Sequence, residues 1–129
     1  MKMHHVALSI RNLDVSADFY KNVFGFIEVK RFERKDLGGK AVFLKLNDMQ
    51  IEIWQFDKQV KNKDDFSNLN ILGIKHIAFE VDNIEEKHKE LKSKGINISE
   101  PRMGASGSRH CLLKDPDGLP IELYEKIIV

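Results

Sequence analysis

Two histidines and two glutamates stand at matching positions in the two halves of this 129-residue sequence. His5 and Glu52 are 47 positions apart (52 − 5), and His76 and Glu122 are 46 positions apart (122 − 76). Imidazole nitrogens and carboxylate oxygens together suit a borderline divalent ion such as Ni²⁺, Zn²⁺, Co²⁺, Mn²⁺ or Fe²⁺. We therefore predict a site for one divalent ion with these four side chains as its ligands. An octahedral ion held in this way keeps positions for water or substrate.

The four residues belong to a longer internal repeat. The stretch HVALSIRNL at 5–13 aligns with HIAFEVDNI at 76–84, and IEIW at 51–54 aligns with IELY at 121–124. Self-similarity of this kind indicates a duplicated supersecondary unit.

The repeat predicts a single domain over residues 1–129 that is made of two modules. The modules cover residues 1–56 and 74–129, and residues 57–73 form the linker between them. Hydrophobic periodicity predicts a strand, a helix and three further strands in each module, which is a βαβββ order. The predicted fold class is therefore α+β. If the modules pair with pseudo-twofold symmetry, their sheets form an open, barrel-like metal-binding cleft.

In the first module, Asn12 or Asp14 is placed to cap a helix, and Gly25 is placed to end it. Four residues at helical spacing are expected to face the core: Leu13, Ala17, Tyr20 and Phe24. The predicted elements are a strand at 5–10, a helix at 14–24, and strands at 27–34, 41–46 and 49–56.

In the second module, Asp82 or Asn83 is the candidate helix cap and Gly95 the candidate stop. The stretch DPDG at 115–118 predicts a tight turn, because its proline presets φ and its glycine tolerates a positive φ. The predicted elements are a strand at 76–81, a helix at 84–94, and strands at 97–102, 109–114 and 119–126.

Alternation along the strands places the four predicted ligands on one kind of surface. Aliphatic residues of the first strand must face the helix, so His5 faces the opposite way. Ile51 and Ile53 leave Glu52 on that opposite face by the same argument. The second module repeats the arrangement for His76 and Glu122.

Other polar residues carry weaker signals. We expect His4 to have a structural or solvated role, and His88 to be half-buried in helix packing. His110 lies in a strand that borders the predicted cleft, where contact with substrate is the minority interpretation. We expect Cys111 to be a small buried hydrophobe rather than a nucleophile, because no base is placed beside it.

Three features leave two interpretations open. Trp54 and Tyr124 follow the predicted glutamate ligands by two residues, and they either line the cleft or pack in the core. The glycine- and serine-rich stretch GASGSR at 104–109 is either a mobile lid or only a connection.

Composition sets further limits. The formal net charge is +1 and 42% of residues are hydrophobic, which favours neither a nucleic-acid nor a membrane surface. Neither a signal peptide nor an apolar run long enough for a membrane span is apparent. Only one cysteine is present, so no intrachain disulfide can form. We therefore expect a cytoplasmic protein.

Four stretches carry a resemblance to a known family: HHVALSI, QIEIW, GIKHIAFEVDNI and DPDGLPIELYE. They resemble the vicinal oxygen chelate superfamily, which contains glyoxalase I, bleomycin-resistance proteins and extradiol dioxygenases. The resemblance covers essentially the whole chain. It implies paired βαβββ modules around a divalent metal, with His5, Glu52, His76 and Glu122 as its ligands. No separate cofactor-binding residues are implied.

The complete set of two histidines and two glutamates resembles that of glyoxalase I. This implies a metal-dependent carbon–sulfur lyase, similar to lactoylglutathione lyase, that acts in methylglyoxal detoxification. Its substrate would be a thiol–aldehyde adduct, and the product a 2-hydroxyacyl thioester. Glu122 would be the catalytic base, and Glu52 would serve the opposite stereoisomer. The resemblance also implies a homodimer.

Alternatives remain within and beyond this chemistry. A methylmalonyl-CoA epimerase-like enzyme or a thiol-transferase would use the same metal site, and a non-catalytic protein of the bleomycin-resistance type would only bind a small molecule. Bacterial glyoxalase I typically has an arginine at the position of Ser9, which helps to bind glutathione, and an asparagine at that of Phe56. These replacements argue against glutathione as the thiol.

Overall fold

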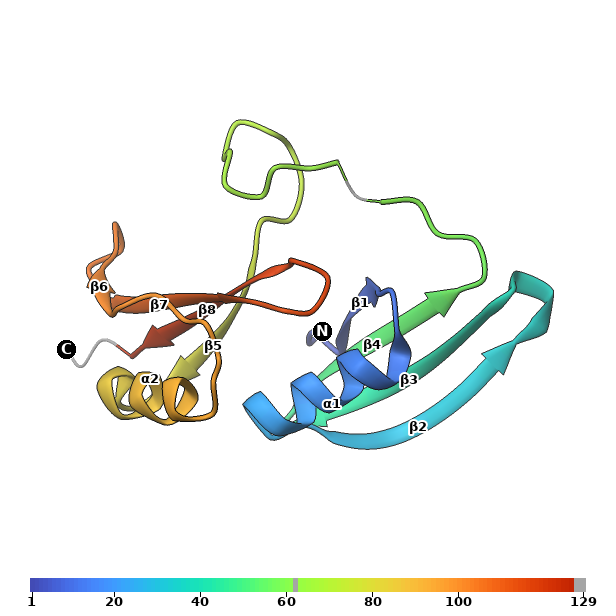
Figure 1. The fold of residues 1–129 in the computed structure, drawn as a ribbon, viewed down its shortest axis with the longest axis horizontal. Helices are drawn as coiled ribbons and strands as arrows, with labels where there is room; N and C mark the ends of the chain where they lie inside the picture. Colours follow the sequence, from blue (N-terminus) through green and yellow to red (C-terminus); the bar gives the residue numbers. More distant parts are fainter. Residues whose placement is uncertain (62, 127–129) are drawn as a thin grey trace. The chain divides into compact units, whose positions relative to one another are not determined.

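The two halves of the chain fold with the same order of main elements (Figure 1). The computed structural model describes residues 1–61 and 63–126, and the chain divides into the units Met1–Asn62 and Lys63–Val129. The boundary between the units lies within the predicted linker at 57–73. Residue 62 of that linker and residues 127–129 of the predicted second module lie outside the described residues.

The first unit is a four-stranded sheet with one helix. Its elements are β1 (His5–Ser9), α1 (Leu13–Phe24), β2 (Ile27–Arg34), a 3₁₀ turn η1 (Lys35–Leu37), β3 (Gly39–Leu46) and β4 (Met49–Phe56). The strands lie in the order β1-β4-β3-β2, and only β1 and β4 pair in parallel.

The second unit repeats this topology. Its elements are β5 (Ile77–Val81), α2 (Ile84–Ser93), β6 (Arg102–Met103), β7 (Arg109–Lys114) and β8 (Pro120–Glu125). The strand order is β5-β8-β7-β6, again with one parallel pair, β5 with β8. The α+β class is confirmed, but each sheet keeps two edge strands and neither closes into a barrel.

One predicted strand is largely wrong. The prediction placed a strand at 97–102, whereas regular pairing is limited to Arg102–Met103. Ser99 exchanges hydrogen bonds with the backbone of Leu112, since its N–H donates to the Leu112 carbonyl and its hydroxyl accepts from the Leu112 N–H, both at 2.9 Å. Pro101 has no N–H to continue such a ladder, so the chain runs irregularly up to β6.

Helix α1 begins and ends as its flanking residues predict. Of the two candidate caps, Asn12 is the one used: its Oδ1 accepts a hydrogen bond from the Val15 N–H at 3.0 Å. Gly25 ends the helix in the left-handed region at φ 83°. The core-facing stripe contains Val23 rather than the predicted Phe24, which stays half-buried.

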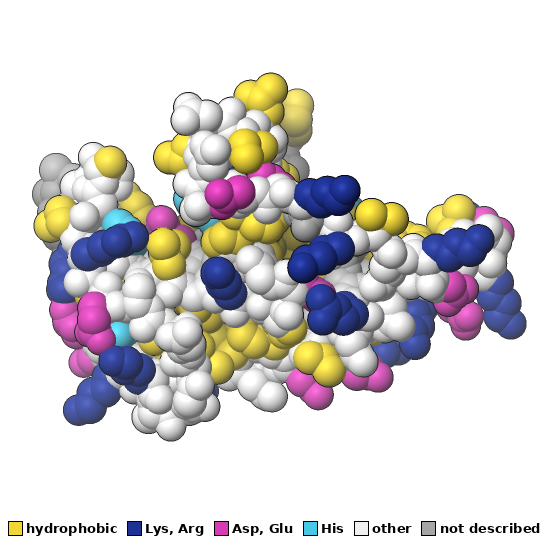
Figure 2. Space-filling view, turned by 45° about the horizontal axis from the view of Figure 1, so that its top comes forward, with side chains coloured by type: hydrophobic (Ala, Val, Ile, Leu, Met, Phe, Trp, Pro, Cys, Tyr) yellow, Lys and Arg dark blue, Asp and Glu magenta, His cyan; other side chains and the backbone are white. Residues whose placement is uncertain are grey.

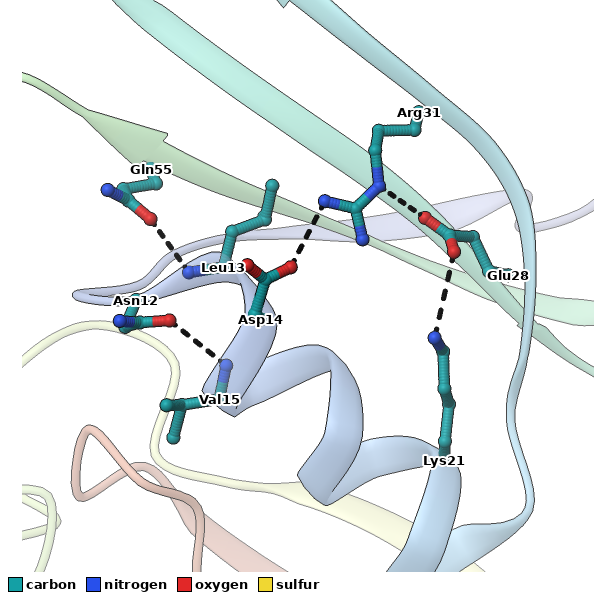
Figure 3. A network of polar contacts seen from close by, with 8 residues as sticks. All are labelled: Asn12, Leu13, Asp14, Val15, Lys21, Glu28, Arg31 and Gln55. Carbon is teal, nitrogen blue, oxygen red and sulfur yellow. Dashed lines mark hydrogen bonds and ion pairs between the residues drawn. The ribbon is translucent and has the colours of Figure 1, made fainter.

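Both helices are also tied to the last strand of their own unit. The side-chain oxygen of Gln55 in β4 accepts a hydrogen bond from the Leu13 N–H at 2.8 Å (Figure 3). Glu125 in β8 does the same for the Ile84 N–H at 2.8 Å. In α2, Asn83 is the cap, with Oδ1 accepting from the Glu86 N–H at 3.1 Å. Each helix start is therefore fixed to the strand that carries a predicted glutamate ligand.

A second set of polar contacts joins α1 to β2. Arg31 donates to Glu28 at 2.7 Å and to Asp14 at 3.2 Å, and Lys21 lies 3.6 Å from Glu28 (Figure 3). These side chains are between 32% and 78% exposed, so the ion pairs contribute little to stability.

On the face that Figure 2 shows, charged side chains of both signs are interspersed. In the described part of the chain, every helix is too short or too polar to cross a membrane.

Replacing Asn12 with alanine should lower the free energy of unfolding by about 1 kcal/mol, because the Val15 N–H loses its side-chain acceptor. Urea denaturation followed by circular dichroism measures the change. Asn12→Ser is the matched control, since a serine hydroxyl keeps an acceptor at the cap. Equal loss in both variants would show that this cap does not stabilise the helix.

Candidate metal-binding site

In both units, the predicted histidine and glutamate ligands are diagonal neighbours on the parallel strand pair. His5 stands two residues before the alanine that is opposite Glu52 in the β1–β4 register. His76 stands two residues before the alanine that is opposite Glu122 in the β5–β8 register. Residues two apart on a strand share a face, so each histidine lies on the same face as its glutamate.

Burial follows the predicted alternation. Ile51 and Ile53 are 4% and 0% exposed, whereas Glu52 between them is only half-buried. Ile121 and Leu123 are likewise buried on either side of a half-buried glutamate. The aliphatic residues thus belong to the core under the helix, and the glutamates belong to the other face of each sheet.

In the second unit the two candidate ligands already lie close together. Nε2 of His76 is 3.7 Å from Oε2 of Glu122, and the two side chains are 42% and 17% exposed. An ion with ligand distances of about 2.1 Å can touch two atoms that are up to about 4.2 Å apart. The separation in this pair is therefore below the upper limit for two atoms that share one ion.

In the first unit, His5 is oriented by two aromatic neighbours. Its Nδ1 lies 2.8 Å from Nδ1 of His4, and its ring meets the Phe43 ring edge-on at 5.3 Å. The contact with His4 engages Nδ1 of His5, which leaves Nε2 for the predicted role of His5 as a ligand. The contact agrees with the structural role that was one of the two expected for His4.

The aromatic residues that follow the two glutamates differ in their contacts. Trp54 Nε1 donates a hydrogen bond to Oε1 of Glu52 at 2.5 Å. Tyr124, at the matching position, instead lies 3.3 Å from the Ser106 hydroxyl, and this hydrogen bond lowers the pKa of Tyr124 from its ordinary value. Both aromatic side chains are half-buried.

Within the described residues, no three His, Cys, Asp or Glu side chains form a group that could hold a metal ion. Each unit supplies one histidine and one glutamate, so the four-residue ligand set of His5, Glu52, His76 and Glu122 stays a prediction.

Two other histidines and the stretch at 104–109, for which the sequence suggested a role, make local contacts within their own unit. His88 is 7% exposed, with Nε2 3.6 Å from Glu100, so it is more deeply buried than predicted. His110 accepts a hydrogen bond from Arg102 at 3.3 Å. The stretch at 104–109 connects β6 to β7 through a tight turn, in which the Gly104 N–H donates to the Ser108 carbonyl at 2.8 Å.

Comparison with known proteins places these features in context. The model of the glyoxalase/bleomycin resistance protein/dioxygenase superfamily matches residues 2–123. Mitochondrial methylmalonyl-CoA epimerase of Dictyostelium discoideum is 34% identical, over 97% of this chain and 78% of its own length. Lactoylglutathione lyase of Neisseria meningitidis is 29% identical, over 98% and 91%. The crystal structure of a glyoxalase family protein from Enterococcus faecalis superposes with a TM-score of 0.83 at 30% identity, over 96% and 97%.

Cys111 should be inert in the folded protein. It is 0% exposed, and burial raises the pKa of its thiol to about 11. At pH 8 a thiol with that pKa is about 100-fold less ionised than one with a pKa near 9. Absorbance assays with Ellman's reagent should therefore show at least this slowing relative to the protein in urea. Equal rates in both states would contradict the burial of Cys111.

Proposed function

This chain belongs to the glyoxalase/bleomycin resistance protein/dioxygenase superfamily, and on that premise we propose that it is a metal-dependent enzyme that moves a proton at a carbon next to a carbonyl group. The repeated histidine–glutamate pair carries the proposal. His76 and Glu122 approach to 3.7 Å, and His5 and Glu52 have the same register relation on their own strands.

In this proposal His5, Glu52, His76 and Glu122 together hold one divalent ion, which is Ni²⁺, Zn²⁺, Co²⁺, Mn²⁺ or Fe²⁺. A bound ion of this kind supplies Lewis-acid stabilisation of the negative charge that develops when a carbon loses its proton. The ion is needed because a carboxylate with an ordinary pKa of about 4 is too weak a base to remove a carbon-bound proton without such stabilisation.

The proton is carried by Glu122 in this scheme. Its carboxylate takes the proton from one carbon and, in a lyase, returns it to the neighbouring carbon. In an epimerase, the carboxyl group of Glu52 would give a proton to the opposite face of the same carbon. Trp54 donates a hydrogen bond to Glu52 at 2.5 Å, whereas Glu122 lies at the longer distance of 3.7 Å from Nε2 of His76. We therefore assign the role of base to Glu122, and Glu52 would serve the opposite stereoisomer.

The first candidate reaction is that of glyoxalase I. A hemithioacetal of a thiol and a 2-oxoaldehyde such as methylglyoxal loses the proton on its sulfur-bearing carbon and regains it on the adjacent carbon. Its hydroxyl proton moves to the former ketone oxygen, which completes the 2-hydroxyacyl thioester. The presence of glutamate at both carboxylate positions supports this lyase. Ser9 and Phe56 favour a thiol other than glutathione.

The second candidate is an epimerase of a malonyl-type thioester. Its support is the 34% identity to the methylmalonyl-CoA epimerase of Dictyostelium discoideum over 97% of this chain. The first step on the protein side is the same: Glu122 takes the proton from the carbon next to the thioester. A proton from the carboxyl group of Glu52 then adds to the opposite face, and exchange with solvent restores both groups. The substrate and the group that returns the proton distinguish the two reactions.

The proposal includes a cytoplasmic homodimer. The family resemblance supports the dimer, and the single buried cysteine is in keeping with a reducing compartment.

Metal-free protein should be inactive and should regain activity with about one equivalent of ion per site. Metal content is measured after loading with each of the five ions, and activity is assayed with methylglyoxal plus several thiols and with methylmalonyl-CoA. Lyase activity with one thiol supports the first candidate, and epimerisation alone supports the second. Less than about 0.2 equivalents of bound ion would refute the proposal in favour of a binding protein.

Glu122→Gln should keep the fold and lose between about 10²- and 10⁴-fold in kcat, because the amide cannot accept the proton. Exchange of the substrate's carbon-bound hydrogen with deuterated water, followed by NMR, reports the proton transfer directly. Lys114→Gln, on the exposed end of β7, is the control and should exchange at the normal rate. A fully active Glu122→Gln variant would remove this residue from the role of base.

A further inference from the structure

We propose that Trp54 is a positioning residue, whose indole N–H holds one oxygen of Glu52 so that the other oxygen serves the metal ion. The inference rests on the proposed function, since it needs Glu52 to be a metal ligand. It assigns the tryptophan to the support of the metal site, beyond the two roles of lining and packing that the sequence left open.

The contact itself is short and suited to this role. Trp54 and Glu52 are two residues apart on β4 and therefore point to the same face of the sheet. The N–H of an indole can only donate, and a hydrogen bond to a carboxylate is of the strong, charge-assisted class. The bond of 2.5 Å uses Oε1 and leaves Oε2 of Glu52 as the remaining ligand atom.

The indole is held in place from two sides. Its ring stacks on the Phe56 ring at 5.3 Å with an interplanar angle of 5°, and Phe32 meets it edge-on at 5.3 Å and 89°. Small residues, Ala41 and Ser9, stand opposite Trp54 on the two neighbouring strands. Gly39 likewise leaves room for the aromatic rings, because a Cβ there would come within 2.6 Å of the Phe56 ring.

The second unit lacks this support at the matching position. Tyr124 follows Glu122 as Trp54 follows Glu52, but its hydroxyl is engaged with Ser106 rather than with the glutamate. The two glutamates, equivalent in the repeat, are thus supported differently. Glu52 is thus the carboxylate that the indole holds, whereas Glu122 approaches Nε2 of His76 at 3.7 Å.

Trp54→Phe removes the N–H and keeps an aromatic ring, so it should weaken metal binding without unfolding the protein. Loss of a residue that orients a metal ligand typically reduces affinity about 10- to 100-fold. Zn²⁺ affinity is measured by competition with a chromophoric chelator, with thermal melting as the check on folding. Tyr124→Phe is the matched control in the other unit and should bind Zn²⁺ like the wild type.

The results separate the inference from the proposed function. Wild-type protein that binds no ion refutes the proposed function. Wild-type protein that binds Zn²⁺, together with weaker binding by Glu52→Gln and unchanged binding by Trp54→Phe, refutes only the inference. If Trp54→Phe fails to fold, benzothienylalanine at position 54 replaces it, since this residue has the shape of tryptophan without the N–H.

Fluorescence gives a second readout, because Trp54 is the only tryptophan in the sequence. Zn²⁺ added to the metal-free wild type should change its emission with the same affinity as the chelator assay reports. The change should be absent from Glu52→Gln, in which the amide replaces the carboxylate that joins the indole to the ion. An emission change of equal size in Glu52→Gln would overturn the inference.

Discussion

Parallel pairing between the first and last strands of each unit is the interaction on which the rest of the structure depends. The β1–β4 and β5–β8 registers fix which histidine lies diagonal to which glutamate. A slip of one residue would turn Glu52 or Glu122 into the core and bring an aliphatic neighbour to the open face. Burial of Ile53 and Leu123 under the helices opposes that slip. Hydrophobic packing on one face of each sheet therefore keeps the glutamate on the other face.

The helices take part in this constraint through their first turns. Gln55 and Glu125 each stand three residues beyond a predicted ligand and accept a hydrogen bond from the first N–H of their helix. A helix that shifted along its sheet would have to break this bond as well as its apolar contacts. Pairing with the neighbouring strands thus fixes the strand that carries the glutamate, and the hydrogen bond from the first N–H of the helix fixes it further.

Local rules were enough to predict the repeat, both helices and most strands, and they narrowed each helix cap to two candidates, of which the asparagine is used. They failed at 97–102, because Pro101 interrupts pairing that the apolar pattern alone would allow. The placement of Glu52 and Glu122 on the sheet face away from the helix followed from the alternation of side chains along each strand. The contacts of His4 with His5 and of Trp54 with Glu52 did not, because they depend on ring orientations that Phe43, Phe56 and Phe32 impose from other positions.

The two units differ most in their outer strands. β2 has eight residues with a register shift between Glu28 and Lys30, whereas its counterpart β6 has two. Even so, the histidine-to-glutamate separation differs by a single position (47 against 46). Insertions and deletions after a gene duplication can therefore accumulate at the edge formed by β2 or β6. The parallel pairs β1–β4 and β5–β8, which carry the predicted ligands, need not change for new specificities to evolve.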